Sequence, residues 1–312
     1  MGKEFKDALK SARELKGADK DYYMPSYRDN IHGGRMDEKH IRMFCKGEGK
    51  ELLPKDGKKE KGACIYSSSM LSYNFFSWID KNHPLVLDGI SYDKVVFEEQ
   101  FRVLATRNNR ANLDVVLVSE DGGTVRLFES KFTEQLDVKA SLSSISDAYY
   151  DSGSYFEYEG VENWAKVFKE DLKGMVDGSS SRYYDGLKQV ACHLVGISSM
   201  IRNAKARKWF NDNSWLAYAL DLPALTGEEN YIFQSIVFCP NTEEEKKRTE
   251  DYLKLNKVFV EEIKRLPDIL PDNLSVDKPI ITYRDLWNSG MEKSVEDPAL
   301  KAYLEKYLKV HI

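Results

Sequence analysis

The chain has 312 residues, 42% of them hydrophobic and 12% aromatic, which is enough to bury a large core and excludes disorder along its whole length. It carries 46 Lys and Arg against 51 Asp and Glu, a net charge of −5, so attraction to a polyanion requires a local basic patch. There is no apolar run of membrane-spanning length and no signal-peptide core at the start, and the four cysteines show no paired spacing, so we expect a reduced, cytoplasmic protein without a membrane partner.

Two regions differ in composition. Residues 1 to 62 are polar and dense in charge and predict an N-terminal arm or cap, with a helix near 3 to 16. Residues 63 to 312 predict one α/β domain with a C-terminal extension of helix and strand. Within it, Ser67–Ile79 reads as an apolar helix that leads into a sheet, and Lys94–Val103 alternates as a strand does.

A hairpin follows in the middle of the chain. Leu113–Val118 and Thr124–Phe132 are apolar runs rich in β-branched residues, joined by an Asp-Gly-Gly turn. Because side chains alternate along a strand, Glu129 and Lys131 point to the same face, where Asp114 can meet them across the ladder. Two carboxylates and an ammonium on apolar strands are costly to bury unless they pair or hold a metal ion. These three residues therefore form the candidate site, with an exposed cross-strand ion pair as the alternative.

A third acid is expected from the preceding strand. Glu99 shares a face with apolar residues, whereas Glu98 shares the other face with Gln100 and Arg102. A lone carboxylate on an apolar face needs a partner, so Glu99 is the preferred additional metal ligand and Glu98 is the close second. A solvated edge strand explains the same pattern without a ligand.

The clearest helix comes later in the chain. Ser179–Ser181 precedes apolar residues that recur at helical spacing from Leu187 to Ile197, which predicts an amphipathic helix with a serine N-cap. Gln189 and His193 lie four residues apart and share a helix face that can project toward the strands. Gln189 is a candidate for orienting substrate or ligands, with an ordinary surface glutamine as the alternative, and a lone His193 is more often structural.

The remaining elements supply architecture. Tyr231–Phe238 predicts a core strand, Thr242–Lys264 a surface helix and Leu300–Leu308 a terminal helix. Just before the hairpin, Arg107 and Arg110 are candidates for contacts to phosphate, and solvated loop residues are the alternative.

Asp114, a short hairpin and Glu129-x-Lys131 in a strand together resemble the PD-(D/E)XK nuclease superfamily, the restriction-endonuclease-like phosphodiesterases, over roughly the middle third of the chain. Asn112-Leu113 stands before Asp114 where the family name has a proline. The resemblance implies a mixed central sheet flanked by helices. It also implies that Asp114 and Glu129 hold a catalytic Mg²⁺, with Mn²⁺ as a substitute, and that Lys131 positions or activates the attacking water.

The helix residues carry a second, partial resemblance. Gln189 followed four residues later by His193 resembles the Gln-x-x-x-Tyr element of some of these nucleases, with histidine in place of tyrosine.

We therefore expect a magnesium-dependent nuclease that hydrolyses phosphodiester bonds, with DNA as the expected substrate. The alternative is a catalytically idle nucleic-acid-binding or protein-interaction module on the same scaffold, and hydrolysis of another phosphate ester fits the same metal site. The sequence leaves open DNA versus RNA, endo versus exo cleavage, sequence specificity and the oligomeric state, a homodimer included.

Overall fold

The computed structural model describes residues 3–46, 50–55, 57–133, 146–172, 183–240 and 243–310. Its strands are β1 (Leu85–Leu87), β2 (Ile90–Arg102), β3 (Arg110–Ser119), β4 (Thr124–Lys131), β5 (Asn230–Val237), β6 (Leu274–Ser275) and β7 (Ile280–Thr282). Within the described residues they form one open sheet in the order β1 to β6, with β7 also pairing with β5. The pairs from β1 to β4 are antiparallel and those made by β5 are parallel, so the sheet is mixed.

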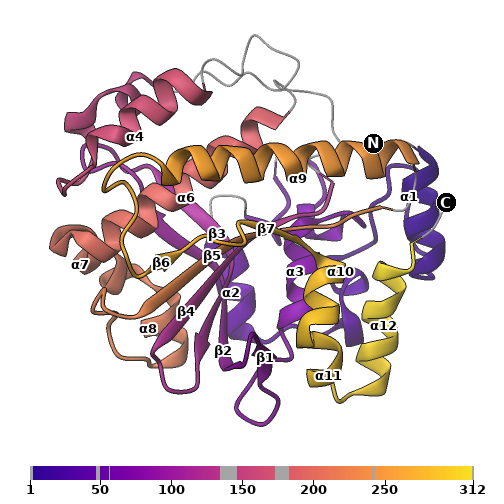
Figure 1. Ribbon diagram of the computed structural model, residues 1–312. Helices are drawn as coiled ribbons and strands as arrows, with labels where there is room; N and C mark the ends of the chain where they lie inside the picture. Colours follow the sequence, from indigo (N-terminus) through magenta and orange to yellow (C-terminus); the bar gives the residue numbers. More distant parts are fainter. Residues whose placement is uncertain are drawn as a thin grey trace.

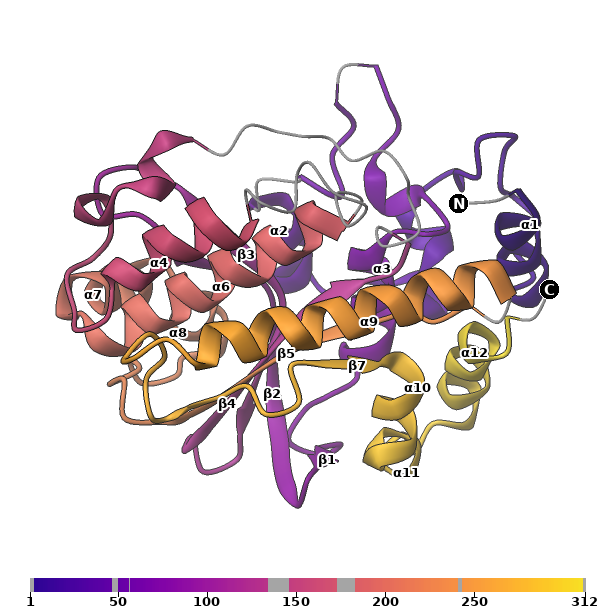
Figure 2. The same cartoon turned by 45° about the horizontal axis from the view of Figure 1, so that its top comes forward.

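Helices cover both faces of this sheet (Figure 1). The first helices along the chain are α1 (Lys3–Ala12), α2 (Glu38–Lys46), α3 (Ser68–Phe76) and α4 (Glu162–Lys166). They are followed by α6 (Tyr184–Arg202), α7 (Ala204–Asn213), α8 (Trp215–Leu220), α9 (Glu243–Lys264), α10 (Tyr283–Leu286), α11 (Glu292–Ser294) and α12 (Pro298–Leu308). Helices α6 and α9 lie on one face and α3 on the other (Figure 2). The chain is therefore an α/β protein, as the sequence predicts.

The expected hairpin is confirmed. Strands β3 and β4 pair in antiparallel register, with Val116 opposite Leu127. The preceding strand β2 pairs with β3 along most of its length, and β4 pairs with β5 in parallel, which places Glu129 beside Ser235. Charged residues of three neighbouring strands are thereby brought to the middle of the sheet.

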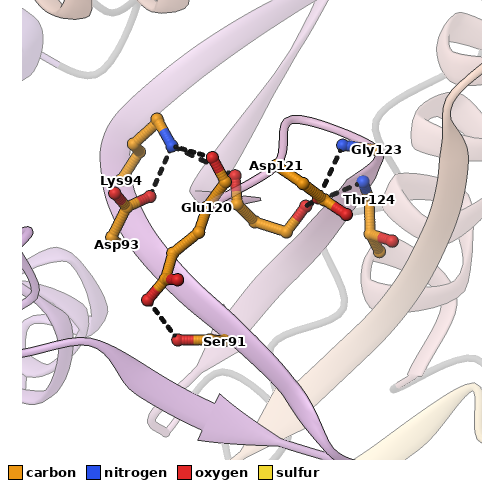
Figure 3. A network of polar contacts seen from close by, with 8 residues as sticks. Ser91, Asp93, Lys94, Glu120, Asp121, Gly123 and Thr124 are labelled. Carbon is orange, nitrogen blue, oxygen red and sulfur yellow. Dashed lines mark hydrogen bonds and ion pairs between the residues drawn. The ribbon is translucent and has the colours of Figure 1, made fainter.

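The turn of this hairpin is closed by its own side chains (Figure 3). The Asp121 carboxylate accepts hydrogen bonds from the Ser119 hydroxyl at 2.5 Å and from the Gly123 backbone N–H at 2.9 Å. The Ser119 hydroxyl in turn accepts from the Thr124 backbone N–H at 2.9 Å, and Lys94 of β2 donates to the Ser119 carbonyl at 3.1 Å. A turn satisfied in this way fixes the register of β3 against β4.

Helices of the N-terminal segment belong to the common core. Phe5 and Leu9 of α1 and Met43 and Phe44 of α2 are buried in the same hydrophobic cluster as the sheet. Helix α2 packs on β2. The division into an arm and a domain at residue 62 stays a prediction, but these helices pack as part of the core.

Other sequence expectations agree with the structure in position. The strand expected at 231–238 corresponds to β5, and the helices expected at 242–264 and 300–308 correspond to α9 and α12. The serine cap expected at 179–181 lies outside the described residues. No helix among the described residues is both long and apolar enough to cross a membrane.

One glycine lets α6 approach the sheet closely. A Cβ atom added to Gly196 would lie 2.7 Å from the Cβ atom of Phe101 in β2, a distance at which one element must move. The small residue therefore sets the separation between α6 and the strands that carry the charged residues.

We predict that Gly196→Ala destabilises the protein by about 1–3 kcal/mol, because the added methyl group overpacks the contact with Phe101. Urea denaturation measures this change. Gln189→Ala, at an exposed position of the same helix, is the control and should stay within ~0.5 kcal/mol of wild type. A Gly196→Ala protein more stable than wild type, as alanine's higher helix propensity alone would produce, contradicts the close-packing account.

Candidate active site

Three carboxylates come together from three neighbouring strands. In the β2–β3 register Phe97 pairs with Val115 and Glu99 with Leu113, so Glu98 lies across from Asp114 between these pairs. The β3–β4 register likewise continues past Val115 and Phe128 to bring Asp114 beside Glu129. The three groups repel one another: in addition to burial, the charges of Glu129 and Glu98 raise the pKa of Asp114. Asp114 is partly exposed, while Glu98 and Glu129 are buried.

Glu129 is held by two basic side chains. The Lys131 ammonium lies 2.5 Å from Glu129 Oε1, and His193 Nε2 of α6 lies 2.8 Å from Glu129 Oε2. All three side chains are at most 6% exposed. A buried carboxylate with a basic side chain beside each oxygen keeps a fixed orientation, and removing Lys131 would take away the ammonium that pairs with Oε1.

Asp114 is anchored by the backbone of the next strand. Its Oδ2 atom accepts a hydrogen bond from the Ser130 backbone N–H at 2.6 Å. The Ser130 side chain points to the opposite face, where its hydroxyl lies 2.6 Å from the Tyr283 hydroxyl of α10. Asp114, Glu129 and Lys131, the three residues expected to form the site, therefore meet in the structure.

The pKa values of the three carboxyl groups shift in opposite directions. Burial, with the charges of Glu129 and Glu98, raises the pKa of Asp114 well above its usual range. Burial, with Glu51 and Glu129, raises the pKa of Glu98 to about 8. Burial also disfavours the ionised form of Glu129, but Lys131 and His193 outweigh this effect and lower its pKa to about 2. Titratable groups with opposite shifts in one buried cluster are typical of functional sites.

Glu98 has an unusual backbone. Its φ angle is +54°, in the left-handed region that a residue with a Cβ atom rarely adopts inside a strand. Its carboxylate accepts a hydrogen bond from Asn112 Nδ2 at 3.4 Å. Backbone strain of this kind costs on the order of 1–3 kcal/mol and is retained where surrounding structure imposes it, often at functional sites.

Glu99, the preferred extra ligand in the sequence, serves a different purpose. Its Oε2 atom accepts hydrogen bonds from the Ser214 hydroxyl at 2.9 Å and from the Trp215 and Leu216 backbone N–H groups at 3.0 and 3.3 Å. These donors form the start of α8, so Glu99 ties that helix to β2. Burial raises the pKa of Glu99 to about 7, and the hydrogen bonds from Ser214 and the backbone oppose this rise. We therefore replace Glu99 by Glu98 as the third candidate acid.

The two candidates on α6 separate in a similar way. His193 is buried against Glu129, whereas Gln189 is exposed one turn earlier, and among the described residues no hydrogen bond links it to the cluster. In the sequence Gln189 was the functional candidate and His193 was expected to be structural, yet it is His193 that the structure brings to Glu129. The two side chains differ in how deeply they are buried between α6 and the sheet, and that burial depends on how closely α6 approaches the strands.

The two candidate arginines lie at the entrance of β3. Arg107 is exposed and donates to the Ser146 hydroxyl at 2.7 Å. Arg110 is partly buried and donates to Gln100 Oε1 at 2.9 Å and to Asn108 Oδ1 at 3.3 Å. Arg110 is the first residue of β3, the strand that carries Asp114.

The donor chemistry suits a hard cation. Glu98, Asp114 and Glu129 offer only oxygen atoms, which Mg²⁺ prefers, and their mutual repulsion would be relieved by a divalent charge. Among the described residues, however, no three His, Cys, Asp or Glu side chains converge as a ready metal site. Glu129 is turned toward Lys131 and His193, so it would have to exchange one of these partners to become a ligand.

Comparison of the chain with protein-family models, with curated proteins and with solved structures found no match. The assignment of a function therefore depends on the residues and their geometry.

The two neighbouring glutamates give opposite predictions for stability. Glu99→Ala should destabilise the protein by about 1–3 kcal/mol, because it leaves buried donors of α8 without an acceptor.

Glu98→Gln removes a carboxyl whose pKa rises from 4.5 in the unfolded chain to about 8 in the folded protein. The wild type loses stability as the pH rises through this window, because the unfolded chain releases the proton before the folded chain does.

We therefore expect the stability of Glu98→Gln relative to wild type to increase between pH 4.5 and pH 8, by ~1 kcal/mol or more. Chemical denaturation at pH 5, 6.5 and 8 measures both variants. A difference between Glu98→Gln and wild type that does not change with pH would show that Glu98 is not held in its protonated form by the cluster.

Proposed function

We propose that this protein is a magnesium-dependent nuclease that hydrolyses phosphodiester bonds in DNA, on a scaffold similar to that of the restriction endonucleases. The observation that carries the proposal is the meeting of Glu98, Asp114 and Glu129 with Lys131 on three adjacent strands. The mixed sheet flanked by helices supports the scaffold, and the order of acid, hairpin and acid-x-lysine supports the chemistry.

Glu98, Asp114 and Glu129 would hold the divalent ion, with Mn²⁺ as a substitute for Mg²⁺. When bound, such an ion polarises the phosphoryl group and lowers the pKa of water. Asp114 is the best placed of the three, because it is partly exposed and its carboxylate is fixed by the Ser130 backbone.

Lys131 contributes a positive charge at the same place. Its ammonium lies against Glu129 and shares the strand face of Asp114, where it can orient the attacking water and offset negative charge on a phosphoryl oxygen. His193 holds the other oxygen of Glu129 and acts as a positioning residue for that carboxylate.

A second candidate function is favoured by the engagement of Glu129. With Oε1 beside Lys131 and Oε2 beside His193, the carboxylate already takes part in buried ion pairs. The same arrangement would suit a catalytically idle nucleic-acid-binding or protein-interaction module that retains these charges for specificity of folding. Two observations argue against the idle module. The pKa of Asp114 is raised and the backbone of Glu98 is strained, and a structural ion pair needs neither feature.

Cleavage of DNA tests the proposal directly. We expect the wild-type protein to cut supercoiled plasmid, linear duplex or single-stranded DNA with Mg²⁺ or Mn²⁺. Asp114→Asn and Lys131→Met should each lower the rate by about 10²-fold or more, because the first removes an ionised oxygen ligand and the second removes the charge beside the reacting phosphate. Gel assays of product formation measure these rates.

The controls are Glu305→Gln and Lys309→Met, which break a surface ion pair at the C-terminal end of α12 and should cut at the wild-type rate. Cleavage that persists unchanged in Asp114→Asn and Lys131→Met would contradict the site. Absence of cleavage on all three substrates, with DNA binding in Ca²⁺ retained, would favour the idle module.

A further inference from the structure

Alternate residues at the start of β3, next to the carboxylate cluster, are partly exposed. Arg110, Asn112 and Asp114 are partly exposed, while Ala111 and Leu113 between them are buried. Alternate residues of a strand share a face, so the three open residues lie on one side. Arg110 is four residues from Asp114, a separation of about 13 Å along the strand.

Hydrogen bonds connect this row to the cluster. Arg110 Nη1 donates to Gln100 Oε1 at 2.9 Å, and Gln100 Nε2 donates to Asn112 Oδ1 at 3.1 Å. Asn112 Nδ2 then donates to Glu98 Oε2 at 3.4 Å. A continuous series of side-chain hydrogen bonds between β2 and β3 thus connects the cluster to Arg110.

Pairs of basic and aromatic side chains lie on helices that pack on β2 or join its partner β3 to them. The Arg110 guanidinium lies over the Trp209 ring of α7 at 5.6 Å. On the neighbouring helices α2 and α8, Lys46 lies 4.7 Å over the Trp215 ring, and Arg42 donates to the Tyr218 hydroxyl at 3.1 Å. Helices α2, α7 and α8 all pack on β2, so these pairs are held by the same strand as Glu98.

Tyr218 is unusual in its exposure. It is 68% exposed, more than any other large hydrophobic side chain among the described residues, and it packs edge-on against Trp215 with ring centroids 5.6 Å apart. Its ring therefore stands supported on one side and open on the other. Arg42 is also exposed, and its ion pair with Glu38 at 2.5 Å is of the surface type that is readily exchanged.

We propose that Arg42, Lys46, Arg110, Trp209 and Tyr218 form a platform that binds single-stranded nucleic acid and directs it along the open row of β3 to the carboxylate cluster. An exposed aromatic ring offers a stacking surface to an unpaired base, while the flanking cations contact the phosphates. A duplex keeps its bases stacked on one another, so it cannot use Tyr218 in this way. The direction of the strand toward the cluster rests on the proposed function, whereas the binding itself does not.

Nearby charge agrees with this partner. The overall charge of the protein is −5, so a polyanion needs a local source of attraction. Lys39, Arg42 and Lys46 are exposed on α2, and Lys205 and Lys208 are exposed on α7, the helix that carries Trp209.

Fluorescence anisotropy in EDTA, with a labelled 20-nucleotide single strand and a duplex of the same sequence, tests the proposal without cleavage. We expect the single strand to bind more tightly than the duplex. Tyr218→Ala should weaken single-strand binding about 5-fold to 150-fold, and Tyr218→Phe should retain it, because stacking needs only the ring. Arg42→Ala should reduce the slope of log affinity against log salt by about 0.7.

The matched controls lie on or just beyond α9: Val258→Ala removes an exposed apolar side chain and Arg265→Ala an exposed charge. Both should bind as wild type does. Unchanged single-strand affinity in Tyr218→Ala, or an equal loss for single strand and duplex, would overturn the proposal.

Cleavage assays of the same preparations separate this inference from the proposed function. Tyr218-dependent binding by a wild-type protein that cuts nothing would support the platform and reject the nuclease. Cleavage that depends on Asp114, together with a single-strand affinity that is unchanged in Tyr218→Ala, would support the nuclease and reject the platform.

Discussion

The mutual repulsion of three carboxylates on adjacent strands is the constraint to which the rest of the structure responds. Glu98, Asp114 and Glu129 come from β2, β3 and β4 and raise the cost of one another's ionisation. Lys131 and His193 outweigh that cost at Glu129, whereas at Asp114 the charge of Lys131 opposes the rise in pKa without overcoming it. An arrangement of this kind reduces the free energy of unfolding, so its retention is better explained by a function than by stability.

The surrounding fold holds the cluster in place through register and close packing. A satisfied hairpin turn aligns β3 with β4, and Gly196 lets α6 come near enough for His193 to reach Glu129. Glu99 ties α8 to the same strand in which Glu98 has a left-handed backbone. The helices that bear the proposed platform are thus positioned by the strand that supplies one of the acids.

Local periodicity predicted the hairpin and the meeting of Asp114, Glu129 and Lys131, because strand alternation depends on neighbouring residues alone. It did not distinguish Glu98 from Glu99, because the left-handed backbone of Glu98 and the contact of Glu99 with α8 arise from tertiary structure. Helical spacing likewise placed Gln189 and His193 on one face but could not say which is buried. The cation–aromatic pairs join residues that are distant in sequence, and no local pattern indicates them.

The most direct test of the central claim is the stability of the protein with and without divalent metal. If the carboxylates form a metal site, Mg²⁺ or Mn²⁺ should raise the unfolding temperature of the wild type, by the equivalent of about 2.7 kcal/mol at a hundred times the dissociation constant. Asp114→Asn should lose this response. An unfolding temperature of the wild type that neither ion changes, or an equal increase in Asp114→Asn, would contradict the account.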